Sequence, residues 1–252
     1  MSQLIVERIK ENLKEIGLKG IYRIVEEKIK QAEVENLSYS EFLDILMEEE
    51  IRYRIEKRSN TLLKLANFPF IKTIEEFDFN FQPSIPQATI KEICNLNFIE
   101  RKENIILLGP PGVGKTHLAI GIGIKACETG KKVYFCDMGN LIKILKEANV
   151  KREAFLNKVS LLIIDEVGYF PIDRYESYLF FQLISNKYEK SSIIITSNKS
   201  FIEWGDIFSD QALVGAILDR LLHHSIIINI KGQSYRLRNK IMEKREKNLT
   251  EK

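Results

Sequence analysis

The chain has 252 residues, of which 44% are hydrophobic and 29% charged, and its formal net charge is +3. This composition is typical of a soluble globular protein with one large domain, or with a core domain and a smaller attachment. Three cysteines without a CxxC pair argue against disulfide and zinc frameworks, and no apolar run approaches the ~18 residues of a membrane span. The charged N-terminus excludes a signal peptide, so we expect a cytoplasmic protein without a membrane partner.

The positive charge is concentrated in two segments. Residues 51–72 carry six basic side chains against Glu56 alone, and residues 236–252 carry seven basic and three acidic side chains. Basic segments on a near-neutral body suit a polyanion such as nucleic acid, although solvated surface explains them equally well.

Residues 1–66 are predicted to form a small helical domain, because residues 4–65 contain no proline and their apolar positions follow helical spacing. The broad apolar stripe of its last helix comprises Phe42, Leu43, Leu46, Ile51 and Ile55. Ser40 is the expected N-cap of that helix. Residues 67–86, with three prolines and an aromatic cluster, predict an extended linker that packs onto the next domain.

Residues 87–238 are predicted to form an α/β domain with a parallel five-stranded sheet. Its strands are short, branched apolar runs, separated by helix-length segments: 104–109, 132–137, 160–165, 192–198 and 225–231. Such runs are typical of strands buried on both faces, and alternating strands and helices imply helices on both sides of the sheet. A basic tail, 239–252, completes the chain.

The segment "GPPGVGKTH" follows the first strand and fits the pattern G-x-x-x-x-G-K-[ST]. Its glycines let successive backbone N–H groups point at phosphate oxygens, and the following helix adds its positive end. Lys115 can reach the outer phosphates of ATP, and the Thr116 hydroxyl can ligate Mg²⁺. The predicted nucleotide-binding residues are Gly109, Pro110, Pro111, Gly112, Val113, Gly114, Lys115, Thr116 and His117.

Two consecutive carboxylates end the third strand, in "SLLIIDEVGY". Parallel strands present their carboxyl ends at one edge of a sheet, so this pair is expected beside the cradle. Asp165 would face the Mg²⁺, and Glu166 would polarise the water that attacks the γ-phosphate. The pair favours ATP hydrolysis over small-molecule phosphorylation, for which the chain also shows no arginine-rich lid.

Further candidates follow the fourth strand and the last helix. Asn198 could hold the attacking water, or it could form a turn. Arg220 lies on an apolar helix and could act on the nucleotide of a neighbouring subunit, or it could pair with an acid of its own chain. Arg236 or Arg238 could sense the γ-phosphate, with surface charge as the alternative. His223, His224 and Trp204 are interpreted as packing residues.

Several segments together resemble the IstB-type transposition helper ATPases, which belong to the AAA+ class alongside DnaC-type helicase loaders. The resemblance runs from about Ser38 to Arg238 and is carried by "NFPFIKTIEEFDF", "GPPGVGKTHLAIGIG", "LLIIDEVGYFPIDR", "YLFFQLISNKYE", "TSNKSFIEWGDIF", "AILDRLLHHS" and "GQSYRLR". It implies a homo-oligomeric ATPase that binds duplex DNA with little sequence preference and acts with a cognate transposase. A DnaC-like helicase loader is the alternative, since both share the nucleotide chemistry.

The resemblance also implies roles for individual residues. Positions that match family motifs are the Walker A pair Lys115 and Thr116, the Walker B pair Asp165 and Glu166, sensor 1 Asn198, the arginine finger Arg220 and sensor 2 Arg236. Gln233 stands where the family often has glutamate, which leaves any role of that carboxylate in doubt. The appended helical domain supplies the candidate DNA contacts Arg52, Arg54, Lys57 and Arg58.

Overall fold

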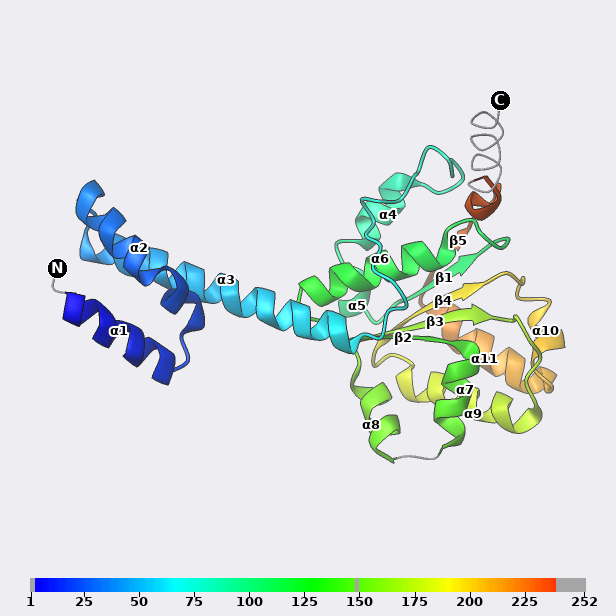
Figure 1. Cartoon of the computed structure of the whole chain (residues 1–252). Coiled ribbons are helices and arrows are strands. Elements are labelled where there is room, and N and C mark those ends of the chain that lie inside the picture. Colours follow the sequence, from blue (N-terminus) through cyan, green and yellow to red (C-terminus); the bar gives the residue numbers. More distant parts are fainter. Residues whose placement is uncertain (1–2, 148–149, 239–252) are drawn as a thin grey trace, which may run out of the picture. The chain divides into compact units, whose positions relative to one another are not determined.

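The computed structural model describes residues 3–147 and 150–238, and it divides the chain into two compact units with the boundary between Thr61 and Leu62 (Figure 1). The predicted basic tail 239–252 lies outside the described residues. The described helices include none that is both long enough and apolar enough to cross a bilayer.

The first unit is helical, as its lack of proline predicts. Its elements are α1 (Gln3–Glu15), α2 (Lys19–Glu35) and α3 (Tyr39–Leu65), whose last residues belong to the second unit. Its small core consists of Leu13, Ile21, Val25, Ile29 and Leu46.

The apolar stripe predicted on α3 is only partly buried. Leu46 is buried and Phe42 packs against the core of the unit, but Leu43, Ile51 and Ile55 are more than half exposed. The predicted helix is present, but these three residues of its stripe lie outside the core of the unit. Helical spacing identifies residues on one side of a helix, but the neighbouring helices decide how wide a stripe they cover.

The start of α3 also differs from the expected Ser40 cap. The Ser38 hydroxyl accepts a hydrogen bond from the Glu41 N–H at 3.3 Å, and the Glu41 carboxylate accepts one from the Ser38 N–H at 2.8 Å. This reciprocal pair is a capping box, which requires an acid three residues after the cap. Ser38 meets that requirement with Glu41, whereas Ser40 lies inside the helix.

Glu50 on α3 holds the start of α2. Its buried carboxylate accepts hydrogen bonds from the Gly20 N–H at 2.7 Å, the Ile21 N–H at 3.2 Å and Arg54 Nε at 2.8 Å. Burial acts to raise the pKa of Glu50, but the bonds from Arg54, Ile21 and Gly20 outweigh it and hold this pKa below its ordinary value. Arg54 is thus one of the groups that stabilise the first unit.

The second unit contains a five-stranded, fully parallel sheet in the order β2-β3-β4-β1-β5. The strands are β1 (Asn104–Leu108), β2 (Val133–Asp137), β3 (Leu161–Val167), β4 (Ser192–Ser197) and β5 (Ser225–Asn229). They coincide with the five predicted apolar runs, so the predicted α/β class is confirmed. The helices are α4 (Gln87–Ile93), α5 (Asn97–Glu100), α6 (Lys115–Glu128), α7 (Met138–Lys146), α8 (Val150–Lys158), α9 (Arg174–Lys187), α10 (Trp204–Ile207) and α11 (Gln211–His223).

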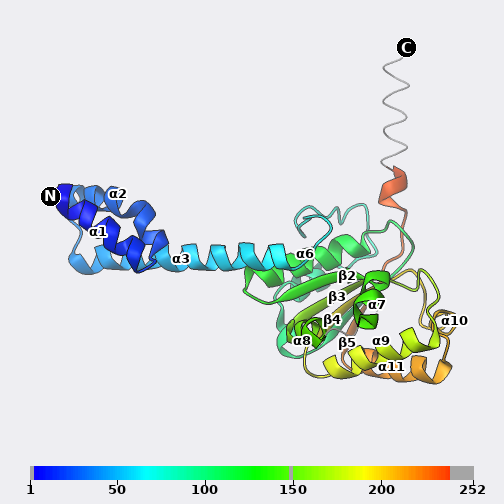
Figure 2. The same ribbon diagram turned by 60° about the horizontal axis from the view of Figure 1, so that its bottom comes forward.

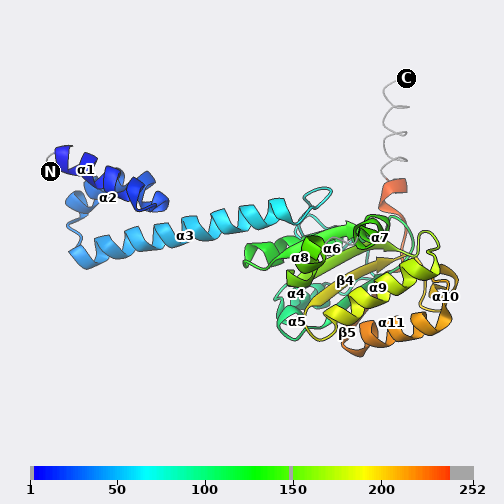
Figure 3. The same cartoon turned by 90° about the horizontal axis from the view of Figure 1, so that it is seen from below.

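Helices cover both faces of the sheet, because successive strand residues point to opposite faces. Ile105 and Leu107 of β1 contribute to a core shared with α4, α5 and α6, whereas Ile106 contributes to a core shared with α7 to α11. Figure 2 shows α6 on one side of the sheet and α7, α8 and α9 on the other, and Figure 3 shows α9 and α11 side by side. This two-sided burial explains the uninterrupted apolar character of the strands.

Three residues predicted to pack have different environments. Trp204 is fully buried in the second core, as predicted. His223 and His224 are exposed, so their prediction as packing residues is wrong. The helix α11 ends at His223, and the chain leaves the core there before β5 begins at Ser225.

Candidate nucleotide site

The segment 109–114 forms a loop between β1 and α6, and α6 begins at Lys115. Gly112 and Gly114 have φ angles of 81° and 100°, which side chains rarely allow. They are also crowded: a Cβ at Gly112 would lie 2.1 Å from Ser234 Oγ, and one at Gly114 would lie 2.5 Å from Phe77 Cε2. The loop therefore curls as predicted, and it requires glycine for both its backbone and its packing.

Lys115 is buried at the mouth of this loop. Its Nζ donates hydrogen bonds to the Gly109 carbonyl at 2.7 Å and the Pro110 carbonyl at 2.8 Å. Burial lowers the pKa of the Lys115 amine, against the opposing field of the Asp165 carboxylate. A desolvated amine whose hydrogen bonds, within the described residues, go to two carbonyl oxygens fits an anionic ligand, which would neutralise its charge.

Asp165 and Thr116 lie side by side, as the parallel sheet predicts. The Thr116 hydroxyl donates to the Asp165 carboxylate, with Oγ1 2.9 Å from Oδ1 and 3.1 Å from Oδ2. Asp165 is only 6% exposed. A hydroxyl beside a carboxylate is an oxygen pair suited to Mg²⁺, which binds few protein ligands and keeps several waters. The residues present thus fit the predicted metal, with Thr116 and Asp165 as its protein ligands.

Glu166 differs from its acidic neighbour Asp165 in exposure. It has a φ of 59° and is exposed, and the pairing of β3 with β4 shifts register between Ile164 and Val167. A left-handed conformation costs a non-glycine residue roughly 1–2 kcal/mol. Such strain is concentrated at functional sites. Here it separates the two carboxylates, since one is buried beside Thr116 and the other faces solvent at the same sheet edge.

Thr196 connects the two acidic residues, and the sequence reasoning missed it. Its hydroxyl donates to Asp165 Oδ1 at 2.5 Å and accepts from the Glu166 N–H at 3.1 Å. It is 1% exposed, on the strand next to β3. The available signal was a threonine in the otherwise aliphatic run "SIIITSN", two residues before Asn198. A buried hydroxyl needs a partner, and here the partners are the acidic pair.

Asn198 lies directly after β4, at the edge of the sheet that carries the loop. The Ser197 carbonyl accepts a hydrogen bond from the Gly109 N–H at 3.1 Å, which fixes the end of β4 beside the start of the loop. Asn198 is half-buried. The structure therefore brings Asn198 to the edge that holds Lys115 and Asp165, as predicted.

A cavity of about 510 Å³ opens beside the loop. Its walls come from several linker residues between Phe70 and Gln82, from Tyr235 and Arg236, and from loop and helix residues other than Lys115, all in the second unit: Gly112, Val113, Gly114, Thr116 and His117. Ligand sites typically measure ~300–1,000 Å³, so this cavity is large enough for a nucleotide. His117 contributes a wall: its Nε2 donates to the Thr73 carbonyl at 2.7 Å, and burial lowers the pKa of its imidazole.

Arg236 and Arg238 have different surroundings. Arg236 lines the cavity, and the field of its guanidinium further lowers the pKa of Lys115. Arg238 lies over the Phe81 ring, with its Nη1 3.7 Å from Asp78 Oδ2, so it braces the linker instead. Of the two predicted sensors, only Arg236 faces the nucleotide cavity.

The comparisons with known proteins agree with this site. The IstB-like ATP binding protein family matches residues 11–243 of the chain. The chain belongs to this family. It is 49% identical over 221 residues to the insertion sequence IS21 ATP-binding protein of Pseudomonas aeruginosa, covering 86% of this chain and 83% of the relative. It is equally identical over 222 residues to the insertion sequence IS5376 ATP-binding protein of Geobacillus stearothermophilus, covering 86% and 88%.

Solved structures show the fold of this IstB-like protein. DnaI superposes with a TM-score of 0.55 at 16% identity, over 68% of this chain and 94% of DnaI. AMPPCP-bound DnaA from Aquifex aeolicus superposes with a TM-score of 0.54 at 22% identity, over 72% and 56%. The AAA+ fold expected from the resemblance is confirmed.

Arg220 lies at the opposite edge of the sheet. Asn104 is the first residue of β1. Its Nδ2 donates a hydrogen bond to the carbonyl of Leu221, the residue after Arg220. The nucleotide loop follows the last residue of β1, about 16 Å away at ~3.3 Å per residue. Arg220 Nη1 donates to the Ala216 carbonyl at 3.0 Å, and its guanidinium lies over the Phe181 ring. Arg220 therefore cannot act on the nucleotide of its own subunit.

Proposed function

We propose that this IstB-like protein hydrolyses ATP, assembles on duplex DNA in an ATP-dependent way, and acts with a cognate transposase in target selection. The observation that best supports ATP hydrolysis is the different exposure of the two consecutive carboxylates. Asp165 is buried beside Thr116, and Glu166 is exposed at the same edge of the sheet. The relatives supply the transposition context, because they are ATP-binding proteins of insertion sequences.

The residues of the site divide the work of hydrolysis. Bound ATP and Mg²⁺ supply the phosphoanhydride bond and the charge that polarises it. The loop N–H groups and Lys115 would hold the phosphate oxygens, and Thr116 and Asp165 would hold the metal. The exposed Glu166 carboxylate accepts the proton of the attacking water, because it is not used in the hydrogen bonds to Asp165. Asn198 orients that water.

Thr196 acts as a positioning residue in this scheme. Thr196→Val keeps the shape of the side chain but removes the hydroxyl that holds Asp165 and the Glu166 N–H. We expect kcat to fall about tenfold, because misplacing a catalytic carboxylate by one lost hydrogen bond costs ~1.4 kcal/mol of transition-state stabilisation. Thr196→Ser should restore most of the rate, whereas a purely structural role would leave kcat unchanged at temperatures where both variants are folded.

The opposite placement of Arg220 supports assembly into oligomers. A guanidinium whose partners among the described residues are a carbonyl oxygen and an aromatic ring keeps its charge available. In the proposed oligomer it stabilises the charge that develops on the nucleotide of the neighbouring subunit. Each nucleotide site is then complete only at a subunit border, which makes assembly depend on ATP.

The candidate DNA contacts lie on α3. Arg52, Arg54, Lys57 and Arg58 are exposed, and their positions span about two turns of the helix. Arg52 pairs with Glu49 and Arg54 with Glu50, so at least these two charges are partly neutralised within the first unit. Phosphate neutralisation by such side chains needs no base contact, which suits binding with little sequence preference.

DNA binding by the full chain tests the proposal. With labelled duplexes of two unrelated sequences, we expect tight binding with ATP and at least tenfold weaker binding with ADP or no nucleotide. Four phosphate contacts predict a loss of about 100-fold in affinity between 50 and 200 mM salt. Lys115→Ala should remove the difference between ATP and ADP. Equal binding in all three nucleotide states would contradict the proposal.

A matched pair of variants locates the DNA surface. The triple variant Arg52→Gln, Lys57→Gln, Arg58→Gln leaves the Arg54–Glu50 pair intact and should weaken binding to both duplexes equally. The control Lys91→Gln, Lys158→Gln, Lys190→Gln removes the same charge from exposed positions of the second unit.

The alternative function, helicase loading, predicts a different partner. A helicase loader would bind a replicative helicase and would not respond to the transposase, so binding to these two partners separates the two candidate functions.

A further inference from the structure

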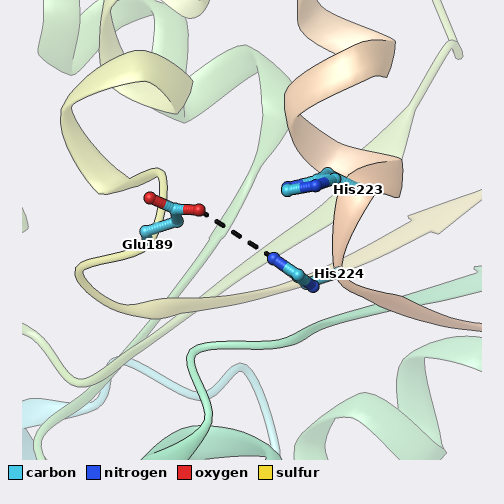
Figure 4. Close-up of side chains that lie close together, drawn as sticks. All are labelled: Glu189, His223 and His224. Carbon is cyan, nitrogen blue, oxygen red and sulfur yellow. Dashed lines mark ion pairs between the residues drawn. The ribbon is translucent and has the colours of Figure 1, made fainter.

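Two histidines and a glutamate gather at the end of α11, away from the nucleotide loop. His223 ends α11, His224 follows it, and Glu189 lies just after α9. Figure 4 shows Glu189 and His224 facing one another beside His223. All three are exposed, and one ligand atom from each lies within 4.8 Å of the others. None of these side chains is used by the nucleotide site.

The three donor groups are exposed, and the Glu189 carboxylate also accepts a hydrogen bond from the Tyr188 side chain. His224 Nε2 lies 3.9 Å from Glu189 Oε1, beyond hydrogen-bond distance, and the two imidazole rings have centroids 3.9 Å apart. His223 Nδ1 lies 2.8 Å from the Tyr188 hydroxyl. That contact occupies Nδ1 and orients the ring, as outer partners of metal-ligating histidines do, so Nε2 is the nitrogen that would bind the ion.

The donor set points to a borderline-soft divalent cation. Two imidazoles and a carboxylate form the three-ligand set of open zinc sites, in which water completes the tetrahedron. Bonds of ~2.1 Å place tetrahedral ligand atoms about 3.4 Å apart, so the exposed side chains need only small rotations to close on an ion. Mg²⁺ prefers oxygen ligands in an octahedron and fits this cluster poorly.

We propose that Glu189, His223 and His224 bind a divalent transition metal of the Zn²⁺ class, with Tyr188 orienting His223. Other ligands of this class are occupied or inert in the described chain. His117 Nε2 donates to the Thr73 carbonyl, and burial raises the pKa of the Cys94, Cys127 and Cys136 thiols, which favours their protonated form. The cluster is therefore the strongest candidate for such an ion.

The proposed ion would join the turn after α9 to the end of α11. Glu189, His224 and Arg220 line one cavity, so the ion would fix the helix turn that carries Arg220. In the proposed oligomer, that helix turn lies at the subunit border. This effect of the ion on Arg220 therefore rests on the proposed function. Metal binding itself does not depend on the proposed function, so it is measured without nucleotide or DNA.

Titration of the chelator-treated full chain tests the site. Calorimetry with Zn²⁺ and visible absorption with Co²⁺ should show one site of micromolar affinity and a tetrahedral spectrum. His223→Ala and His224→Ala should each weaken binding at least 100-fold, while leaving two histidines in the chain. Glu189→Gln, which removes the third ligand, should also weaken binding at least 100-fold, whereas Tyr188→Phe should weaken it about tenfold, as loss of an outer partner does.

Asp206→Asn, an exposed acid outside the cluster, is the matched control and should bind the metal as the unmodified chain does. Because the substituted side chains are exposed, circular dichroism should show that every variant keeps its fold. Absence of saturable Zn²⁺ and Co²⁺ binding overturns the proposal. Binding that persists undiminished in both histidine variants also overturns it, since the metal would then lie elsewhere. Either failure leaves the proposed ATP hydrolysis intact.

Discussion

Glu166→Gln is expected to slow DNA-dependent ATP hydrolysis by about 10²–10⁴-fold, the usual contribution of a general base. Glutamine keeps the size of the side chain, and it keeps the backbone N–H that donates to Thr196. The loss should therefore come from the missing proton acceptor alone. ATP affinity should stay within about threefold, because Lys115, Thr116 and Asp165 are untouched. Phosphate release and binding of a fluorescent ATP analogue measure the two quantities separately.

The same variant should remain on DNA once ATP has bound, because the step that releases it is blocked. The control is Glu128→Gln, an exposed acid at the far end of α6, about 20 Å from the loop at ~1.5 Å per residue. It should hydrolyse ATP at the unmodified rate. If the Glu166→Gln protein also did so, Glu166 would not be the base.

Arg220→Ala is expected to lower hydrolysis about 10³-fold, as loss of an arginine finger does, with ATP binding retained. The side chain lies about a strand length from its own nucleotide loop, so in the proposed oligomer it would act on the nucleotide of the neighbouring subunit. Loss of its contact with the Phe181 ring should cost only ~0.5–1 kcal/mol of stability. Thermal unfolding of the variant checks that this structural cost is small.

A mixture of two inactive variants tests whether Arg220 acts on the nucleotide of a neighbouring subunit or on that of its own chain. In a one-to-one mixture of Arg220→Ala and Glu166→Gln, about a quarter of random borders combine an intact Glu166 with an intact Arg220. The mixture should recover up to about a quarter of the unmodified rate. A mixture as inactive as its components would show that Arg220 does not act on a neighbouring nucleotide.

The sequence by itself determined the sheet and the nucleotide loop. The five strands are predictable because a strand buried on both faces must be a continuous apolar run, whatever its neighbours are. The loop is predictable because its residues are contiguous, and its glycines are required by the backbone of the loop itself. Asp165 and Glu166 could be placed at that edge because parallel strands align their carboxyl ends.

Only the tertiary structure decided how these parts meet. The register shift beside Glu166, and the Thr196 hydroxyl that bonds Asp165 and the Glu166 N–H, arise from pairing between β3 and β4. The exposed face of α3 and the exposed histidines depend on which neighbours cover them, which helical spacing does not encode. Local periodicity specifies the elements, whereas contacts between residues distant in sequence specify their surroundings.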